Sequence, residues 1–353
     1  MKVHVLDPSA YTPPYDHALC AALARAGAAV ELYTSAFPYA ALPEPQGYLR
    51  REHFYRRARG EAGSRRRRVA KSLEHVPDML RYRAAARAAD VVHFQWLAVP
   101  AVDTALLPRR VPLVLTAHDE PLAAARYRRF DAVIAHSEHG RRRLLEAGVA
   151  ERKAHLIPHG VFAHLAALEA APAPAELRDD GTPVVLCFGL LRPYKGLDVL
   201  LDAWRGIERA QLWIVGRPRY DVSALRAAAP PSVQWVTRFV DDRELAACFR
   251  RADLVVAPYR RSEQSGVVAT ALAFGCPLLL SDVGGFGEVA AAGAARLVPP
   301  GDPAALRSAL EELLADPGER ERLAARGRAL AAGEWSWERV AERTLQVYRA
   351  LLS

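Results

Sequence analysis

The sequence predicts an α/β protein built from two doubly wound parallel-sheet domains. Its 353 residues suit two domains, since a domain commonly holds about 100 to 200 residues. Short β-branched and apolar runs alternate with helical patterns in both halves of the chain. A segment rich in alanine and proline separates the two series, so we predict an interdomain linker at residues 166–183.

The first domain is predicted at residues 1–165. Its expected buried strands each end at a polar or turn residue and lie at 2–7, 90–94, 111–116 and 131–135. A helix is expected over 16–27, with Asp16 as its N-cap and Gly27 as its C-terminal stop. This alternation is typical of parallel βαβ units.

The second domain is predicted at residues 184–339, where the alternation restarts. Its strands are expected at 184–188, 211–215, 233–236, 253–257, 277–281 and 296–298. A final amphipathic helix is expected at 340–353. Because doubly wound sheets bind ligands at the carboxyl ends of their strands, a cleft between the two domains is the expected active site.

Composition narrows the class of protein. Hydrophobic residues make up 51% and charged residues 25% of the chain, which is typical of a soluble globular protein. The four cysteines are far apart and show no metal-ligand spacing, so no metal site is predicted. The sequence shows neither a signal peptide nor a run of about 18 apolar residues, and we expect a cytoplasmic protein.

The net charge of +8 raises the question of a nucleic-acid partner. Only 4 of the 48 basic residues are lysines, and the remaining 44 arginines accompany abundant alanine, a pattern that the codon bias of a GC-rich genome explains. The sequence contains no recognition helix, zinc finger or RNA-binding aromatic motif. We therefore predict that the protein does not bind nucleic acid.

The loop from Gly189 to Gly196 carries the most informative chemistry. A strand ends at Gly189, Arg192 and Lys195 follow three residues apart, and a helix begins near Asp198. Two cations beside a helix N-terminus form a receptor for a diphosphate. The alternative is a solvated basic loop. Because Lys195 is one of only four lysines, the diphosphate interpretation is favoured.

This loop resembles the G-R-L-x-x-x-K-G loop of the retaining glycosyltransferases of family 4, with the arginine displaced to Arg192. The resemblance runs from Val3 to about Leu352 and implies the GT-B fold of two facing Rossmann-like domains, with the final helix at 340–353 packing back on the first domain. It implies that Arg192 and Lys195 stabilise the departing diphosphate of a donor sugar, UDP- or GDP-linked, without a metal or other cofactor.

The segment 257–277 resembles the donor-sugar loop and helix of the family. The two glutamates that the family places eight residues apart are missing, and Ser262 and Thr270 stand in their places. Glu263 provides the first carboxylate if the loop shifts by one residue, and the Thr270 hydroxyl then replaces one ribose contact. Other donor-binding candidates implied by the resemblance are Gly189, Gly216, Val240, Ser265, Gly266, Val267 and Glu288.

In the first domain, Thr116-Ala117-His118-Asp119 resembles the T-x-H-D segment of the family, whose histidine lies beside the transferred sugar. His118 is therefore a catalytic candidate, together with Arg192, Lys195 and Glu263. The alternative is that His118 is a structural histidine at the edge of the core. Asp119 is expected to orient His118 or to cap the next helix. The acceptor-side candidates are Asp119, Ser9 and Tyr15.

The run Arg65-Arg66-Arg67-Arg68 is the densest positive segment. In this family such a patch on the acceptor domain can rest on anionic lipid, and a solvated or mobile loop is the alternative. No apolar wedge is apparent beside it, so the expected contact with the inner face of the membrane is peripheral.

These observations predict a retaining glycosyltransferase that moves a sugar from a nucleoside-diphosphate donor to an acceptor hydroxyl on a glycan, a lipid-linked sugar or a small molecule. One alternative is a nucleotide-sugar epimerase or phosphorylase on the same fold. Another is a non-catalytic protein that binds sugar nucleotides, which the missing glutamate pair favours but the Arg192/Lys195 loop and His118 oppose.

Overall fold

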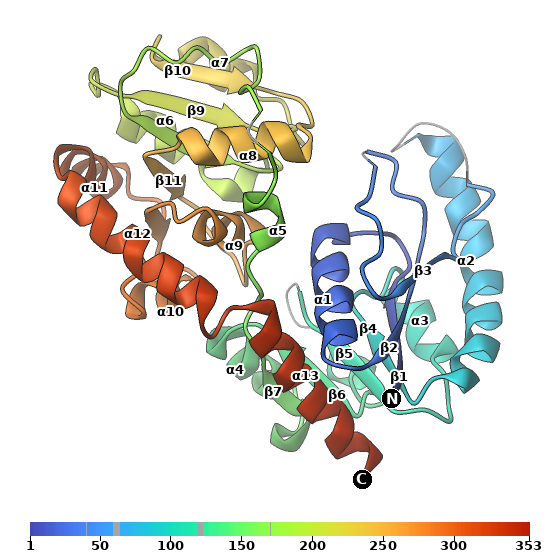
Figure 1. Cartoon of the computed structure of the whole chain (residues 1–353). Helices are drawn as coiled ribbons and strands as arrows, with labels where there is room; N and C mark the ends of the chain where they lie inside the picture. Colours follow the sequence, from blue (N-terminus) through green and yellow to red (C-terminus); the bar gives the residue numbers. More distant parts are fainter. Residues whose placement is uncertain (40, 59–63, 119–122, 170) are drawn as a thin grey trace. The chain divides into compact units, whose positions relative to one another are not determined.

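A computed structural model describes residues 1–39, 41–58, 64–118, 123–169 and 171–353. The chain forms two compact units (Figure 1). The first unit contains residues 1–160 together with 337–353, and the second contains 161–336. The C-terminal helix therefore belongs to the same unit as the N-terminal half of the chain.

The first unit is built on a parallel sheet with strand order β3-β2-β1-β4-β5-β6-β7. Its strands are β1 (Lys2–Asp7), β2 (Ala29–Thr34), β3 (Leu49–Glu52), β4 (Val91–Phe94), β5 (Leu113–Thr116), β6 (Ala132–Ala135) and β7 (Ala154–Leu156). The four predicted strands are present, and β2, β3 and β7 were not predicted. Its helices are α1 (Pro13–Arg25), α2 (Arg65–Ala85), α3 (Pro100–Leu106), α4 (Glu138–Glu146) and α13 (Trp337–Leu352), which packs against α1.

Helix α1 differs from its prediction at its N-terminus. It begins at Pro13, a residue suited to the first turn because its missing N–H is unpaired there in any helix. Asp16 is consequently inside the helix and is not the N-cap. Its side chain is buried, as is that of Asp7 at the end of β1. Burial, and then the charge of Asp7, raise the pKa of Asp16 well above its usual range.

We expect Asp16→Asn to stabilise the folded chain near pH 7. The raised pKa means that the folded state holds a proton on Asp16 that the unfolded state releases, so stability falls as the pH rises above the unfolded value. Asparagine keeps the shape and needs no such proton. Thermal unfolding from pH 5 to 8 should show a variant Tm a few degrees higher, with the gap widening as the pH rises. A variant that melts below the wild type at pH 8 would contradict this account.

The second unit has a parallel sheet with strand order β10-β9-β8-β11-β12-β13. Its strands are β8 (Val184–Phe188), β9 (Gln211–Val215), β10 (Val233–Val236), β11 (Leu254–Ala257), β12 (Leu278–Ser281) and β13 (Ala295–Val298). All six were predicted. Its helices are α5 (Ala163–Ala166), α6 (Leu197–Trp204), α7 (Ser223–Ala228), α8 (Asp242–Arg251), α9 (Gly266–Ala273), α10 (Phe286–Ala291), α11 (Pro303–Ala315) and α12 (Pro317–Ala332). The predicted fold class, two doubly wound parallel-sheet domains, is confirmed.

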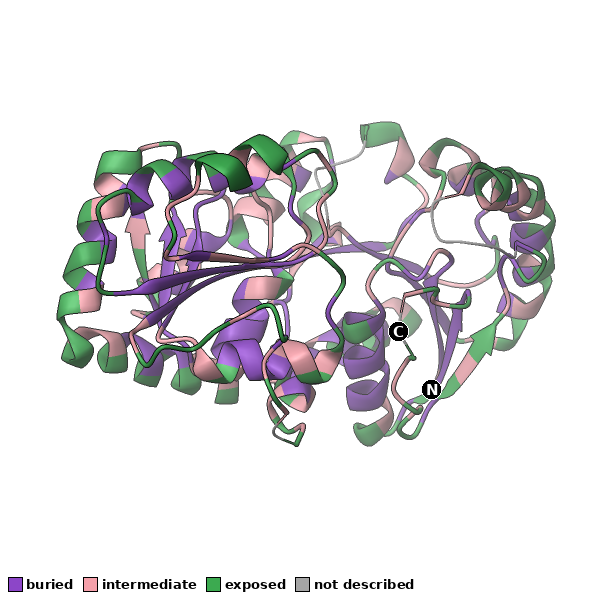
Figure 2. Ribbon diagram, turned by 90° about the horizontal axis from the view of Figure 1, so that it is seen from above, coloured by how far each residue is buried: buried purple, intermediate pink, exposed green. Residues whose placement is uncertain are grey.

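Hydrophobic residues of the second unit pack on both faces of its sheet. Trp213 belongs to the cluster on one face and Trp204 to the cluster on the other, and both side chains are fully buried. Figure 2 shows that most strand residues are buried while the outward faces of the helices are exposed. Two covered faces explain why these strands are continuous apolar runs, the pattern from which they were predicted.

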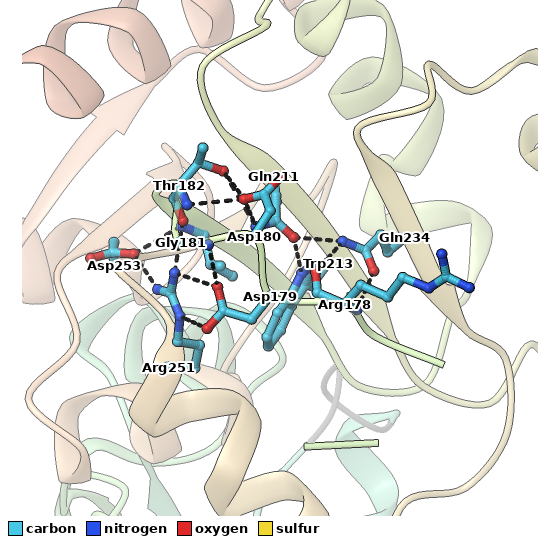
Figure 3. Close-up of polar contacts among 11 residues, drawn as sticks. Arg178, Asp179, Asp180, Gly181, Thr182, Gln211, Trp213, Gln234, Arg251 and Asp253 are labelled. Atoms are coloured by element: carbon cyan, nitrogen blue, oxygen red, sulfur yellow. Dashed lines mark hydrogen bonds and ion pairs between the residues drawn. The ribbon is translucent and has the colours of Figure 1, made fainter. Parts of the chain in front are cut away.

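Residues predicted as part of the interdomain linker are held within the second unit. Arg178 exchanges two hydrogen bonds with Gln234, between its N–H and Oε1 at 2.6 Å and between its carbonyl and Nε2 at 2.8 Å. Arg251 forms ion pairs with Asp179 at 2.5 Å and Asp253 at 2.7 Å (Figure 3). These contacts attach the segment before β8 to strand β10 and helix α8, and the structure groups 161–183 with the second unit.

Helix α2 corrects the prediction that no apolar wedge accompanies the arginine run. Val69, Leu73, Val76 and Leu80 are 52%, 73%, 40% and 49% exposed. Their spacing of four, three and four residues places them on one face of the helix. Arg65 and Arg66 begin the same helix and are also exposed. We call Val69, Leu73, Val76 and Leu80 the α2 stripe.

Candidate functional site

Each sheet has a point at which the strand order reverses, between β1 and β4 in the first unit and between β8 and β11 in the second. Loops leave the carboxyl ends of these strands in opposite directions, so a ligand is accommodated between them. Gln95 and Trp96 follow β4 directly, and Gly189 follows β8 directly. These residues therefore lie at the reversal points of the two sheets.

In the second unit, Lys195 is the central side chain. It is only 7% exposed, and its Nζ donates to the Tyr259 hydroxyl at 2.8 Å while lying 4.7 Å from the centre of that ring. Burial alone lowers the pKa of Lys195, but Tyr259 more than reverses this and the pKa lies above its usual value. A charged ammonium is thus fixed where the loops after β8 and β11 meet.

Two glycines make room for this ammonium. Gly189 has φ of +107°, and a Cβ atom built on it would lie 2.9 Å from Lys195 Nζ. Gly216 has φ of +147°, and its Cβ would lie 1.9 Å from the Gly189 carbonyl oxygen. Both conformations favour glycine, and neither position has space for a side chain. The turns after β8 and β9 therefore pack directly against each other beside Lys195.

Arg192 lies on the same loop as Lys195, whose backbone N–H donates to the Arg192 carbonyl at 3.0 Å. The Arg192 side chain is exposed, and it forms no hydrogen bond or ion pair with the residues that the structure describes. Arg260, after β11, binds Asp198 through both carboxylate oxygens, at 2.9 and 2.6 Å. This ion pair holds the loop after β11 against the start of α6. Because the loop that carries Arg192 and Lys195 leads directly into α6, the pair restrains that loop as well.

The remaining donor-side candidates surround this loop on other elements. The Glu263 carbonyl accepts the Gly285 N–H at 3.3 Å, which joins the loop before α9 to the turn before α10. Ser265 precedes α9, and Gly266 is its first residue. A Cβ on Gly189 would lie 3.0 Å from Val267 Cγ2, so α9 begins next to the Lys195 loop.

Thr270, Val240 and Glu288 are less accessible to a ligand. Thr270 is buried, and its hydroxyl donates to the Gly266 carbonyl at 2.7 Å, so only its lone pairs are available to a ligand. Val240 is buried in the core of the second unit. Glu288 is half-buried in the first turn of α10.

In the first unit, His118 lies after β5 in a cluster of rings and amides. Its ring stacks on Trp96 with centroids 5.0 Å apart and an interplanar angle of 15°, and Tyr15 meets it edge-on at 4.8 Å. Its Nε2 is 3.0 Å from Gln95 Oε1, and its Nδ1 is 3.4 Å from His136 Nε2. Burial, then the nearby His136, lower the pKa of His118 well below its usual value. His118 is therefore neutral near pH 7.

The acceptor-side candidates have different surroundings. Tyr15 is 3% exposed, so it supports His118 from within the core. Ser9 is half-buried in the loop after β1. Asp119 lies outside the described residues. Tyr259, Gln95 and Trp96 were not predicted as partners of the candidate site residues, although each lies within two residues of the end of β11 or β4 and is therefore a strand-end residue.

Both halves of the chain match models of glycosyltransferase families. Residues 15–165 match the family model described as Glycosyltransferase Family 4, and residues 182–316 match that of Glycosyl transferases group 1. The chain belongs to glycosyltransferase family 4. The two matches divide this glycosyltransferase near the boundary between its two structural units.

Several curated proteins are similar to this family 4 glycosyltransferase. A phosphatidyl-myo-inositol mannosyltransferase of Mycobacterium leprae is 38% identical over 204 residues, covering 55% of this chain and 53% of that protein. A D-inositol 3-phosphate glycosyltransferase of Kineococcus radiotolerans is 32% identical over 251 residues, covering 62% and 57%. The chain thus spans about half the length of the curated relatives it matches.

Solved structures share its fold. A sucrose-phosphate synthase of Thermosynechococcus elongatus matches with a TM-score of 0.75 at 22% identity, covering 99% of each chain. The HepE protein of Anabaena, in complex with UDP-glucose, matches with a TM-score of 0.75 at 18% identity, covering 99% of this chain and all of that one (100%). These likenesses confirm the predicted GT-B fold. Among the described residues, no helix has the length and apolar character needed to cross a membrane.

Proposed function

We propose that this glycosyltransferase transfers a sugar from a nucleoside-diphosphate donor to an acceptor hydroxyl with retention of the anomeric configuration. The observation that carries the proposal is the buried Lys195 ammonium beside Gly189, with Arg192 on the same loop. A fixed ammonium and an exposed guanidinium on the loop after β8 suit the two phosphates of such a donor.

These cations act on the charge that develops during transfer. As the bond between the anomeric carbon and the diphosphate breaks, negative charge grows on the departing phosphate oxygen, and Lys195 and Arg192 stabilise that charge. The acceptor oxygen forms its bond on the same face of the sugar and passes its proton to the departing phosphate. Front-face attack of this kind accounts for retention without an enzymic nucleophile, and it needs only fixed positive charge.

The two units have separate roles in this proposal. The second unit binds the donor through the Lys195 loop and the start of α9, with Glu263 near the sugar. The first unit binds the acceptor and presents His118 to a sugar hydroxyl. Because two relatives are named for phosphatidyl-myo-inositol and for D-inositol 3-phosphate, these compounds are the first acceptors to test.

The decisive experiment is calorimetric titration with UDP, GDP, ADP and TDP, followed by assay of the matching nucleotide sugars with and without acceptor. We expect one nucleotide to bind tightly and its sugar to be transferred only when acceptor is present, with an α-linked donor giving an α-linked product by NMR. Binding without turnover would favour the non-catalytic alternative. Turnover without acceptor, or with free phosphate, would favour an epimerase or a phosphorylase. Failure of every nucleotide to bind would refute the donor site.

We also propose that transfer needs no metal cofactor, because Lys195 and Arg192 provide the positive charge on the diphosphate. The expected result is that 5 mM EDTA, roughly the excess used to strip divalent ions, leaves the transfer rate within about twofold of its value in Mg²⁺. The rate is measured before and after chelation and after Mg²⁺ is restored. A rate that falls tenfold and recovers with Mg²⁺ would refute metal independence.

The α2 stripe supports a further part of the proposal, peripheral binding of the first unit to an anionic membrane. Apolar side chains on one exposed helix face, with Arg65 and Arg66 at the start of that helix, suit the boundary between lipid headgroups and acyl chains. Docking there would place the first unit beside a lipid-linked acceptor.

A further inference from the structure

A continuous chain of hydrogen bonds runs through His118 in the first unit. It starts at the Tyr348 hydroxyl of α13, which is 2.5 Å from His93 Nδ1. His93 Nε2 is 2.7 Å from Thr116 Oγ1 and 3.3 Å from the Gln95 amide. Gln95 then contacts His118, which contacts His136. The chain ends where His136 Nδ1 lies 3.0 Å from the Ile157 carbonyl oxygen.

The carbonyl end of this chain fixes the direction of its bonds. The Ile157 oxygen has no proton, so His136 Nδ1 must carry one and donate it. Burial lowers the pKa of His136 to about 4, so the ring is neutral at pH 7 and its Nε2 has only a lone pair. His118 Nδ1 must then donate to His136 Nε2. Because His118 is neutral as well, its Nε2 is left as an acceptor.

Gln95 and His93 complete the same pattern. The Gln95 amide must donate to His118 Nε2, which requires a half-turn that exchanges its oxygen and nitrogen and leaves the other heavy atoms in place. Its oxygen then accepts from His93 Nε2, which also donates to Thr116. His93 Nδ1 is left to accept the Tyr348 O–H, and burial keeps this ring neutral by lowering its pKa to about 3. With this single rotation, every bond from Tyr348 to Ile157 has one donor and one acceptor.

We propose that this chain holds His118 in the Nδ1–H tautomer, and that Gln95 is a positioning residue that occupies the Nε2 lone pair until a substrate hydroxyl replaces it. His118 is half-buried, and Trp96 and Tyr15 fix its ring plane, so Nε2 keeps its direction when the amide leaves. A lone pair accepts from a hydroxyl and cannot donate to a phosphate or a carbonyl.

This inference deepens the proposed function and rests on it for the identity of the hydroxyl. It gives His118 the role of accepting a hydrogen bond from a sugar or acceptor hydroxyl, with no proton transfer required. The tautomer itself is a property of the free protein, so it can be measured without any substrate.

The first test is the two-bond ¹H–¹⁵N NMR spectrum of the histidine-labelled wild type at pH 7.5, with His118→Asn used only to assign the His118 signals. We expect a proton-bearing shift for Nδ1 and a lone-pair shift for Nε2. A proton on Nε2, or on both nitrogens, would overturn the proposal. This result stands even if the protein transfers no sugar, so failure of the proposed function is recognised separately by the titration with nucleotides.

The second test is Gln95→Glu, because a carboxylate only accepts and therefore demands a proton on His118 Nε2. We expect that proton to appear in the NMR spectrum, and transfer to fall about tenfold or more with unchanged nucleotide affinity. Gln46→Glu is the matched control, since Gln46 is exposed in the same unit and gains the same charge. An Nδ1–H tautomer that persists in Gln95→Glu, or undiminished transfer, would overturn the role of Gln95.

Discussion

Lys195→Met is expected to lower the rate of sugar transfer by about 100- to 1,000-fold, the usual effect of removing one group that stabilises transition-state charge. Methionine preserves most of the length and volume of lysine but carries no charge. The buried ammonium beside Gly189 would be lost, along with its hydrogen bond to Tyr259. Rates are measured under single-turnover conditions with the donor that the titrations identify, and nucleotide affinity is measured in parallel.

The control for this substitution must separate lost chemistry from lost folding. Arg226→Ala removes an exposed cation from α7 in the same unit and is expected to leave both rate and affinity unchanged. Tyr259→Phe removes the hydrogen-bond partner of Lys195 while keeping the ring, and we expect it to have an intermediate effect. A Lys195→Met protein that is folded, as judged by its Tm, and transfers sugar at the wild-type rate would refute the role of this loop.

Most of the strands that the sequence predicted have apolar residues on both faces. Strand β3 was missed because three of its four residues, Arg50, Arg51 and Glu52, are polar, as an edge strand permits. Glu31 interrupts the apolar pattern of β2, and it is stabilised there by ion pairs with Lys2 and Arg51 on the neighbouring strands. Such pairing depends on sheet register, which a single strand does not reveal.

The sequence predicted only those parts of the candidate site whose residues lie together in one local motif. Gly189, Arg192 and Lys195 share one loop and were recognised together. Tyr259 comes 64 residues after Lys195, and only the adjacency of β8 and β11 brings the two side chains together. The chain through Gln95 and His136 likewise depends on the order of β4, β5 and β6. Long-range contacts of this kind follow from topology, which the motifs themselves do not encode.

The α2 stripe was missed for a different reason. Its four apolar residues follow the spacing of a helix face that normally packs on a core, and this spacing does not show that the face is exposed. The structure instead buries the other face of α2 through His75, Asp78, Met79 and Tyr82. Polar His75 and Asp78 are satisfied inside by Tyr55, whose hydroxyl is 2.7 Å from His75 Nδ1 and whose N–H donates to Asp78 at 2.7 Å. The apolar face is therefore left to solvent.

Replacing Leu73 and Leu80 of this stripe by serine is expected to weaken binding to anionic vesicles by about 100-fold. The two side chains are 73% and 49% exposed in the free protein, and burying each in lipid is worth about 1.5 kcal/mol or more. Together that is about 3 kcal/mol, which corresponds to roughly two powers of ten in affinity. Sedimentation with vesicles of phosphatidylglycerol and phosphatidylcholine measures the partition coefficient directly.

The double variant Leu49→Ser/Val99→Ser is the matched control, because these residues are 56% and 41% exposed in the same unit but lie outside α2. Its vesicle binding should equal that of the wild type. Arg65→Ala/Arg66→Ala should weaken binding by about 1 kcal/mol per arginine, and only at low salt, since the attraction to anionic headgroups is screened. If the stripe instead joins two copies of the chain, Leu73→Ser/Leu80→Ser will abolish a dimer in sedimentation analysis and leave vesicle binding unchanged. That outcome would refute membrane docking through α2.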